Sequence, residues 1–75
     1  MQIIFSRHAR RRARLYKIPL SAIKNILMNM ELSKGRHEIV KEVKAFKYPL
    51  KIVVSIERDV IKVITNYPLK KGREK

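Results

Sequence analysis

Cysteine is absent from the 75-residue chain, so neither disulfide bonds nor thiolate metal ligands can stabilise the fold. The only glycines are Gly35 and Gly72, which excludes a glycine-rich loop of the kind that binds phosphate groups. No apolar run approaches the roughly 20 residues that span a bilayer, and Met1–Phe5 is too short for the apolar part of a signal sequence. We therefore expect a cytoplasmic protein that is neither secreted nor inserted in a membrane.

Acidic residues are scarce, with six against nineteen lysines and arginines, and the formal net charge is +13. None occurs before Glu31. Heat-adapted proteins also contain many lysines, but they usually balance them with glutamates in ion-pair networks. The excess therefore favours a polyanionic partner. It is concentrated in two groups, Arg7, Arg10, Arg11, Arg12, Arg14, Lys17 and Lys24 near the start and Lys70, Lys71, Arg73 and Lys75 at the end.

A chain of this length has room for one hydrophobic core, so we expect a single domain over residues 1–75. Hydrophobic residues make up 45% of the sequence, which leaves a thin margin once the chain entropy is subtracted. An oligomer or another partner can therefore contribute to stability. We expect residues from about 69 to 75 to form a flexible basic tail.

The segment after Phe5 predicts a helix from about Arg7 to Tyr16, with Ser6 as its N-cap. One side of this helix is apolar and consists of Phe5, Ala9, Ala13 and Tyr16. The opposite side is basic and consists of Arg7, Arg10, Arg11 and Arg14. We expect the apolar side to contact the core and the basic side to face solvent or a polyanion.

Pro19 ends this helix, because the residue before a proline is disfavoured in helical geometry. A second helix is predicted to begin at Pro19 or Ser21. Its apolar side consists of Leu20, Ile23, Leu27 and Met30. Two helices with one apolar side each need an apolar surface to cover, and the C-terminal half of the chain supplies it.

The C-terminal half is rich in β-branched residues and predicts three strands, His37–Lys47, Leu50–Glu57 and Val60–Tyr67. A turn is predicted at Ser33–Arg36, and the two-residue break at Arg58-Asp59 predicts a hairpin. Because this turn lacks the favoured Asn-Gly pair, a bulge or a wider loop is left open there. We therefore expect an α+β fold in which two N-terminal helices pack on a three- to four-stranded antiparallel sheet. Whether Met1–Phe5 adds a strand is left open.

Most common catalytic and ligand sites are excluded by the sequence. His8 and His37 lie far apart without a supporting cluster of carboxylates, so we expect neither a dedicated metal site nor a cofactor. No serine-nucleophile motif and no pair of carboxylates on one helix face is present. The candidates that remain are Ser6, His8, Arg12, Thr65 and Tyr67, with Arg12 one helical turn beyond His8.

Two segments, Phe5–Arg12 and Val63–Pro68, resemble the ends of a widespread family of short domains of unknown function from bacteria, archaea and phages. Members of that family have a Ser-x-His-Ala-x-x-Arg helix start and a final strand similar to Val-Ile-Thr-x-Tyr. The family is similar in layout to the RelE, BrnT and barnase-like group of small ribonucleases, many of which are toxins of toxin–antitoxin pairs. The sequence departs from the pattern at Tyr16, where a second arginine is expected.

The resemblance implies a metal-free endoribonuclease or a toxin-type protein that binds RNA or the ribosome. Cleavage of RNA without a metal needs a base, an acid and cations that stabilise the phosphate. On this basis His8 supplies the base or acid, Arg12 binds phosphate, and Tyr67 with Thr65 lies beside them if the last strand packs against the first helix. RNA binding is assigned to Arg7, Arg10, Arg11, Arg14, Lys70 and Lys71.

Two alternatives to catalysis stay open. The chain can be a nucleic-acid-binding module that does not cleave, or an interaction domain whose basic surface binds an acidic, antitoxin-like protein. Structural roles also compete with the catalytic ones, because a histidine in the first turn of a helix often caps or packs, and the Arg12 stem can pack on a sheet. The sequence alone does not decide between an enzyme and a binding protein.

Overall fold

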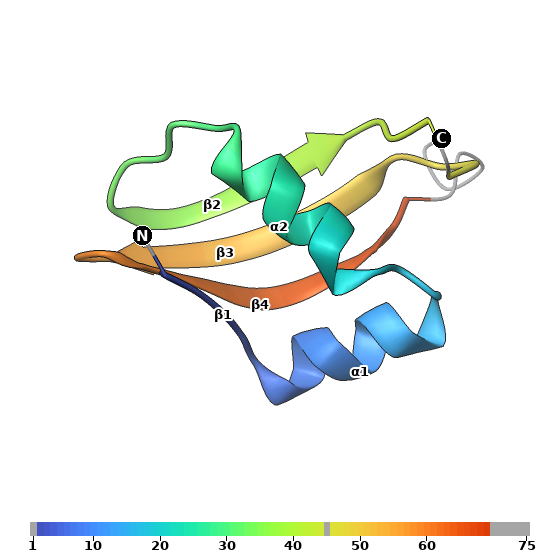
Figure 1. Cartoon of the computed structure of the whole chain (residues 1–75), viewed down its shortest axis with the longest axis horizontal. Helices are drawn as coiled ribbons and strands as arrows, with labels where there is room; N and C mark the ends of the chain where they lie inside the picture. The colour runs from blue at the N-terminus through green and yellow to red at the C-terminus, as the bar shows by residue number, and fades with distance from the viewer. Residues whose placement is uncertain (1, 45, 70–75) are drawn as a thin grey trace.

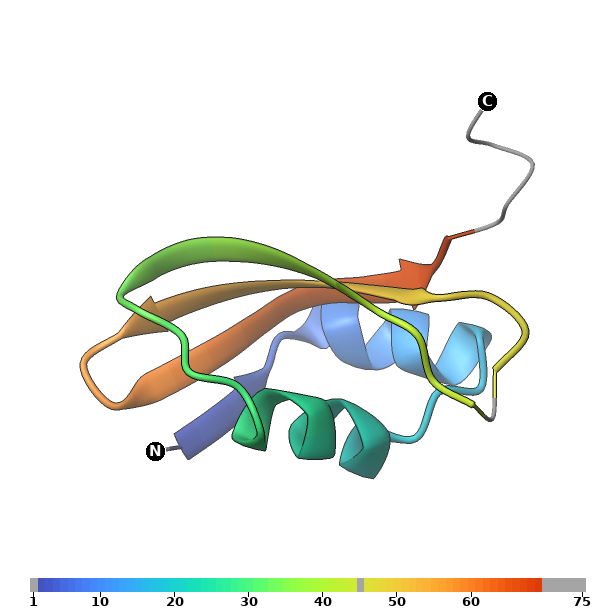
Figure 2. The same ribbon diagram turned by 90° about the horizontal axis from the view of Figure 1, so that it is seen from above.

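The computed structural model describes residues 2–44 and 46–69. Two helices cover one face of a four-stranded sheet, and the opposite face of the sheet is open (Figures 1 and 2). The fold is therefore of the α+β class. Its elements in chain order are β1 (Gln2–Phe5), α1 (Arg7–Leu15), α2 (Leu20–Met28), β2 (Gly35–Lys41), β3 (Leu50–Glu57) and β4 (Val60–Pro68).

The sheet has the order β1-β4-β3-β2, and it is mixed rather than wholly antiparallel. β3 is antiparallel to both of its neighbours, whereas β1 pairs in parallel with β4. The connection through both helices returns the chain to the end of the sheet where β1 began, so β2 runs in the same direction as β1. Two reversals then bring β4 parallel to β1. The expectation of a purely antiparallel sheet is thus wrong at the β1 edge. The described chain also begins with a strand of this sheet, so the two helices follow β1 instead of opening the fold.

Two strand boundaries differ from the predicted ones. β2 ends at Lys41 rather than Lys47, and a turn follows in which the Phe46 N–H donates to the Val43 carbonyl oxygen at 2.9 Å. β2 also begins inside the predicted turn, at Gly35, whose φ of +117° is costly for any residue with a Cβ atom. The tight turn at Arg58-Asp59 is confirmed without a wider loop, since Glu57 pairs directly with Val60.

The core lies between the helices and the sheet, and the alternation predicted for β3 is confirmed. Its helix-facing residues, Leu50, Ile52, Val54 and Ile56, are all buried. α1 contributes only the small residues Ala9 and Ala13, whose size allows the helix to lie close to β4. Tyr16 does not extend this apolar side as expected. Because α1 ends at Leu15 and Lys17 adopts a φ of 56°, Tyr16 is exposed and Ile18 is buried instead.

No helix among the described residues has the length and apolar character needed to cross a bilayer.

Candidate nucleic-acid interface

The outer side of α1 is an exposed arginine surface, hereafter the arginine face. It consists of Arg7, Arg10, Arg11 and Arg14, all of which are exposed. The first turn of α1 contains no acidic residue. Within residues 2–44 and 46–69 the one ion pair joins Lys51 to Glu38, so the arginine face has no carboxylate partner in that part of the chain. Four like charges on one short helix repel one another, and a bound polyanion would relieve that repulsion.

The start of α1 is attached to β4 through Ser6. As predicted, Ser6 is the N-cap, and its hydroxyl oxygen accepts a hydrogen bond from the Ala9 N–H at 3.0 Å. The same hydroxyl donates to the Ile64 carbonyl oxygen at 2.9 Å, and the Ser6 N–H donates to the Val63 carbonyl oxygen at 3.0 Å. The capping residue therefore sets the position of α1 against the middle of β4.

Ile64, whose carbonyl Ser6 binds, is the extra residue of a β-bulge. Opposite β3, Val54 pairs with Val63 and Val53 pairs with Thr65, so Ile64 is skipped in the register. A bulge shifts the side-chain alternation of its strand by one residue. Val63 faces the helices before the bulge, and after it the residue that faces them is Asn66.

The bulge separates the candidate residues of β4 from those of α1. Thr65 and Tyr67 share one face of the sheet, and that face is the open one, opposite α1. His8 is exposed in the first turn of α1, and Arg12 follows one turn later with a partly buried side chain. The structure thus keeps His8 and Arg12 together on the helix and places Thr65 and Tyr67 on the other side of β4.

The remaining candidates are His37 and the basic residues of the predicted tail. His37 lies in β2, and its Nε2 atom is 2.8 Å from the Ser33 carbonyl oxygen. Among the described residues no group of three or more histidines and carboxylates could hold a metal ion. Lys70 and Lys71, together with most of the predicted tail, lie outside the described residues. Leu69, at its start, donates its N–H to the Pro49 carbonyl oxygen at 2.8 Å.

Asn66 was not recognised as important from the sequence, yet it joins β4 to α1. It is the only buried polar residue among those described, with 0% of its surface exposed. Its Nδ2 group donates to the Ala9 carbonyl oxygen at 3.2 Å, and its Oδ1 atom has no hydrogen-bond partner. Without knowledge of the bulge, simple alternation places Asn66 on the solvent side, so no local signal in the sequence could identify it.

The burial of Asn66 predicts a pH-dependent effect of Asn66→Asp. A carboxylate at this site is desolvated without a cation, so we expect the variant to lose about 3 kcal/mol of stability at neutral pH. Desolvation raises the pKa of the new carboxyl group in the folded state. The loss should therefore be small below the unfolded pKa of about 3.9 and grow as the pH rises through the folded pKa.

Urea unfolding at pH 7 and at acidic pH, with the wild-type chain measured in parallel, checks this expectation. The matched control is Asn25→Asp on the exposed side of α2, which should change stability by no more than about 0.5 kcal/mol at either pH. An equal loss for Asn66→Asp at both pH values would show that the carboxylate is not desolvated in the folded protein.

The open face of the sheet contains three rows of side chains, each crossing β2, β3 and β4. The register gives these rows as Arg36–Ser55–Lys62, Glu38–Val53–Thr65 and Val40–Lys51–Tyr67. Lys51 Nζ lies 3.2 Å from Glu38 Oε1. This hydrogen bond, and next the neighbouring Tyr67 phenol, raise the pKa of Lys51, so its ammonium group stays charged at neutral pH. No local pattern in the sequence identifies Lys51 and Glu38 as a pair, because their proximity depends on the register between β2 and β3.

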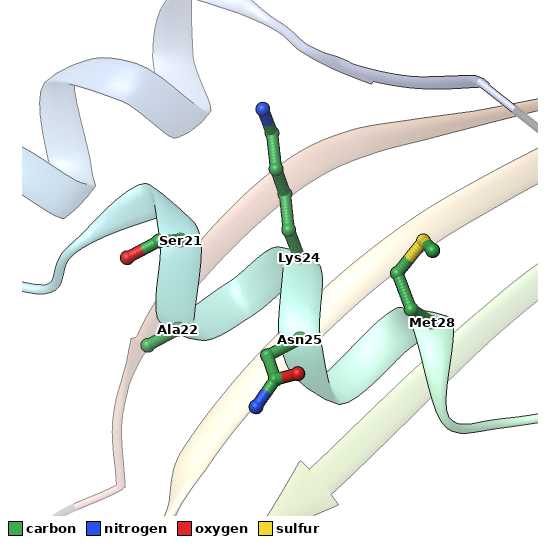
Figure 3. Close-up of a pocket in the computed structure, with 5 residues that line it drawn as sticks. All are labelled: Ser21, Ala22, Lys24, Asn25 and Met28. Carbon is green, nitrogen blue, oxygen red and sulfur yellow. The ribbon is translucent and has the colours of Figure 1, made fainter.

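Two hollows lie on or beside α2. One follows the outer side of the helix, where the side chains of Ser21, Lys24 and Asn25 point in different directions and do not converge (Figure 3). The other, between the end of α2 and the edge of the sheet, is lined mainly by apolar residues such as Leu27 and Ile61, with Glu31 as its one charged residue. Neither arrangement is typical of a catalytic site, in which several polar groups converge on one point.

Comparison of the chain with protein-family models, curated proteins and solved structures finds no match.

Proposed function

We propose that this protein binds RNA through the arginine face of α1. The observation that supports the proposal is the exposure of four arginines on one helix that has no acidic residue in its first turn and no carboxylate partner among residues 2–44 and 46–69. Arginine binds phosphate oxygens through parallel hydrogen bonds, and a row of guanidinium groups matches the repeated charge of a nucleic-acid backbone.

Two further features support RNA as the polyanion. The net charge of +13 on a chain of 8.9 kDa creates a field that attracts any nucleic acid. The helix start from Ser6 and the final strand through Tyr67 also contain the motifs by which the chain resembles RelE- and BrnT-like toxins. We therefore propose a toxin-type RNA-binding protein, with RNA or the ribosome as its target.

The dependence of binding on salt tests this proposal. Each phosphate contact releases counterions, so four contacts to a single strand predict a slope of about −3 in a plot of log affinity against log salt concentration. Fluorescence anisotropy with a labelled, unstructured RNA measures this slope directly. A flat response, or no binding at low salt, would reject RNA binding by the arginine face.

RNA cleavage is the second candidate function, and the position of His8 favours it. The imidazole is exposed at the border of the arginine face, since Arg11 follows His8 by three residues and Arg12 by four, spacings that make side chains of a helix neighbours. A phosphate held by these arginines would therefore lie near an imidazole, a group that can act as general acid or base. Thr65 and Tyr67, on the open face of the sheet, do not enter this step.

A further inference from the structure

The open face of the sheet is a second surface with the chemistry of an RNA site, and it adjoins α1. β1 pairs with β4 only as far as Val63, where its partner is Phe5. Beyond that point α1 lies along the outer edge of β4 (Figure 1). The half of β4 that contains Thr65 and Tyr67 is therefore next to the helix that bears the arginine face.

The open face combines an aromatic ring with separated positive charges. Tyr67 is partly exposed beside the Lys51 ammonium group. Arg36 and Lys62 lie together in the row at the other end, separated from the row of Lys51 and Tyr67 by the central row. Glu38 is the one acidic residue in the three rows. Glu57 of β3, beyond the three rows, is a second acidic residue on this face, so three cations stand against two carboxylates. The remaining positive balance suits a polyanion and disfavours a basic partner.

The aromatic ring of Tyr67 favours a single strand as the ligand of this face. Val53, in the central row, is only 5% exposed, so neighbouring side chains cover it and the polar and aromatic groups of the rows form the outer surface. Bases of a single strand can turn toward such a surface and stack on an aromatic ring, whereas the bases of a duplex are already stacked on each other. Stacking on a tyrosine needs no particular base, so we expect this contact to be independent of the RNA sequence.

We propose that single-stranded RNA continues from the arginine face across β4 onto the open face of the sheet, where a base stacks on Tyr67 and Lys51 binds a phosphate group. The inference rests on the proposed function and names single-stranded RNA as its preferred ligand. The bulge at Ile64 makes the site, because it turns Tyr67 away from the core and toward Lys51. Glu38 competes with the phosphate for Lys51 and so limits the affinity.

The test compares two labelled ligands of equal length, an oligouridylate of about twelve nucleotides and an RNA duplex, by fluorescence anisotropy. Tyr67→Ala should weaken binding of the single strand about five- to tenfold and change duplex binding less than about twofold, because only the single strand loses a stacking contact. Tyr67→Phe keeps the ring and should bind as the wild type does. Glu38→Gln should strengthen single-strand binding about two- to threefold.

The matched control is Tyr48→Ala, which removes an aromatic ring from the loop before β3 and should leave both affinities unchanged. A second measurement uses the unaltered protein, so that it does not depend on the folding of a variant. Photocrosslinking to 4-thiouridine RNA should label a β4 peptide that contains Tyr67 in addition to α1.

The outcomes separate this inference from the proposed function. Loss of single-strand affinity confined to Tyr67→Ala, with crosslinks in β4, supports the inference. If the wild type binds with a steep salt dependence but Tyr67→Ala has no effect, or if crosslinks occur in α1 alone, the open face is not a site and the arginine face stands. If the wild type binds neither ligand, the proposed function itself fails.

Discussion

Replacing His8 by alanine is expected to lower the rate of RNA cleavage about a hundredfold, since general acid–base groups typically contribute at least that much. The affinity for RNA should change less than about twofold, because the arginines proposed to bind the backbone are unaltered. Single-turnover cleavage of a labelled RNA, together with anisotropy measured on an uncleavable analogue, separates the two effects. In cells, expression of the wild type should arrest growth, and His8→Ala should relieve the arrest.

His37→Ala is the control, since it removes the other histidine at a site on β2 away from the arginine face. It should cleave RNA at the wild-type rate. Cleavage by His8→Ala at that same rate would show that His8 is not a catalytic group. If the wild type binds RNA but does not cleave it at any salt concentration, a binding module without catalysis becomes the better description.

Reversing two charges of the arginine face should weaken RNA binding about a hundredfold at low salt. Arg10→Glu combined with Arg14→Glu removes two phosphate contacts and adds two repulsive charges one helical turn apart. The slope of log affinity against log salt should become shallower by about 1.4, which is the contribution of two contacts to a single strand. Both side chains are exposed, so the stability of the fold should change little.

The control for net charge is the double variant Lys44→Glu with Lys47→Glu. It makes the same formal change in exposed residues of the loop between β2 and β3, away from α1. We expect it to weaken binding much less than the α1 variant does. Equal weakening by both variants would mean that the overall field of the protein attracts RNA and that the arginine face is not a defined contact surface.

Local sequence patterns, such as helix caps, helix breaks and strand alternation, predicted much of this fold correctly. The cap at Ser6 and the break at Pro19 locate the two helices, and the alternation along Leu50–Glu57 identifies the helix-facing side of β3. Each of these signals is contained within one element. The α+β class and the tight turn before β4 follow from the same kind of evidence.

The features that local signals missed depend on contacts between distant segments. Parallel pairing of β1 with β4 joins the two ends of the chain, and no pattern within Gln2–Phe5 specifies its partner. The bulge at Ile64 is likewise associated with a bond from Ser6, 58 residues away in sequence. A shift of one residue reverses every later side chain of the strand, so the faces of Asn66 and Tyr67 could not be derived from alternation.

The parallel pairing of the first and last strands affects how the protein folds during synthesis. Gln2 pairs with Val60, and its N–H donates to the Asp59 carbonyl oxygen at 2.8 Å, so the N-terminal strand has no partner until the final hairpin has been translated. Contacts of such high contact order form late and slowly. A growing chain on the ribosome therefore cannot hold α1 against β4 before β4 has been made, and the proposed RNA-binding surface, which spans both elements, cannot assemble earlier.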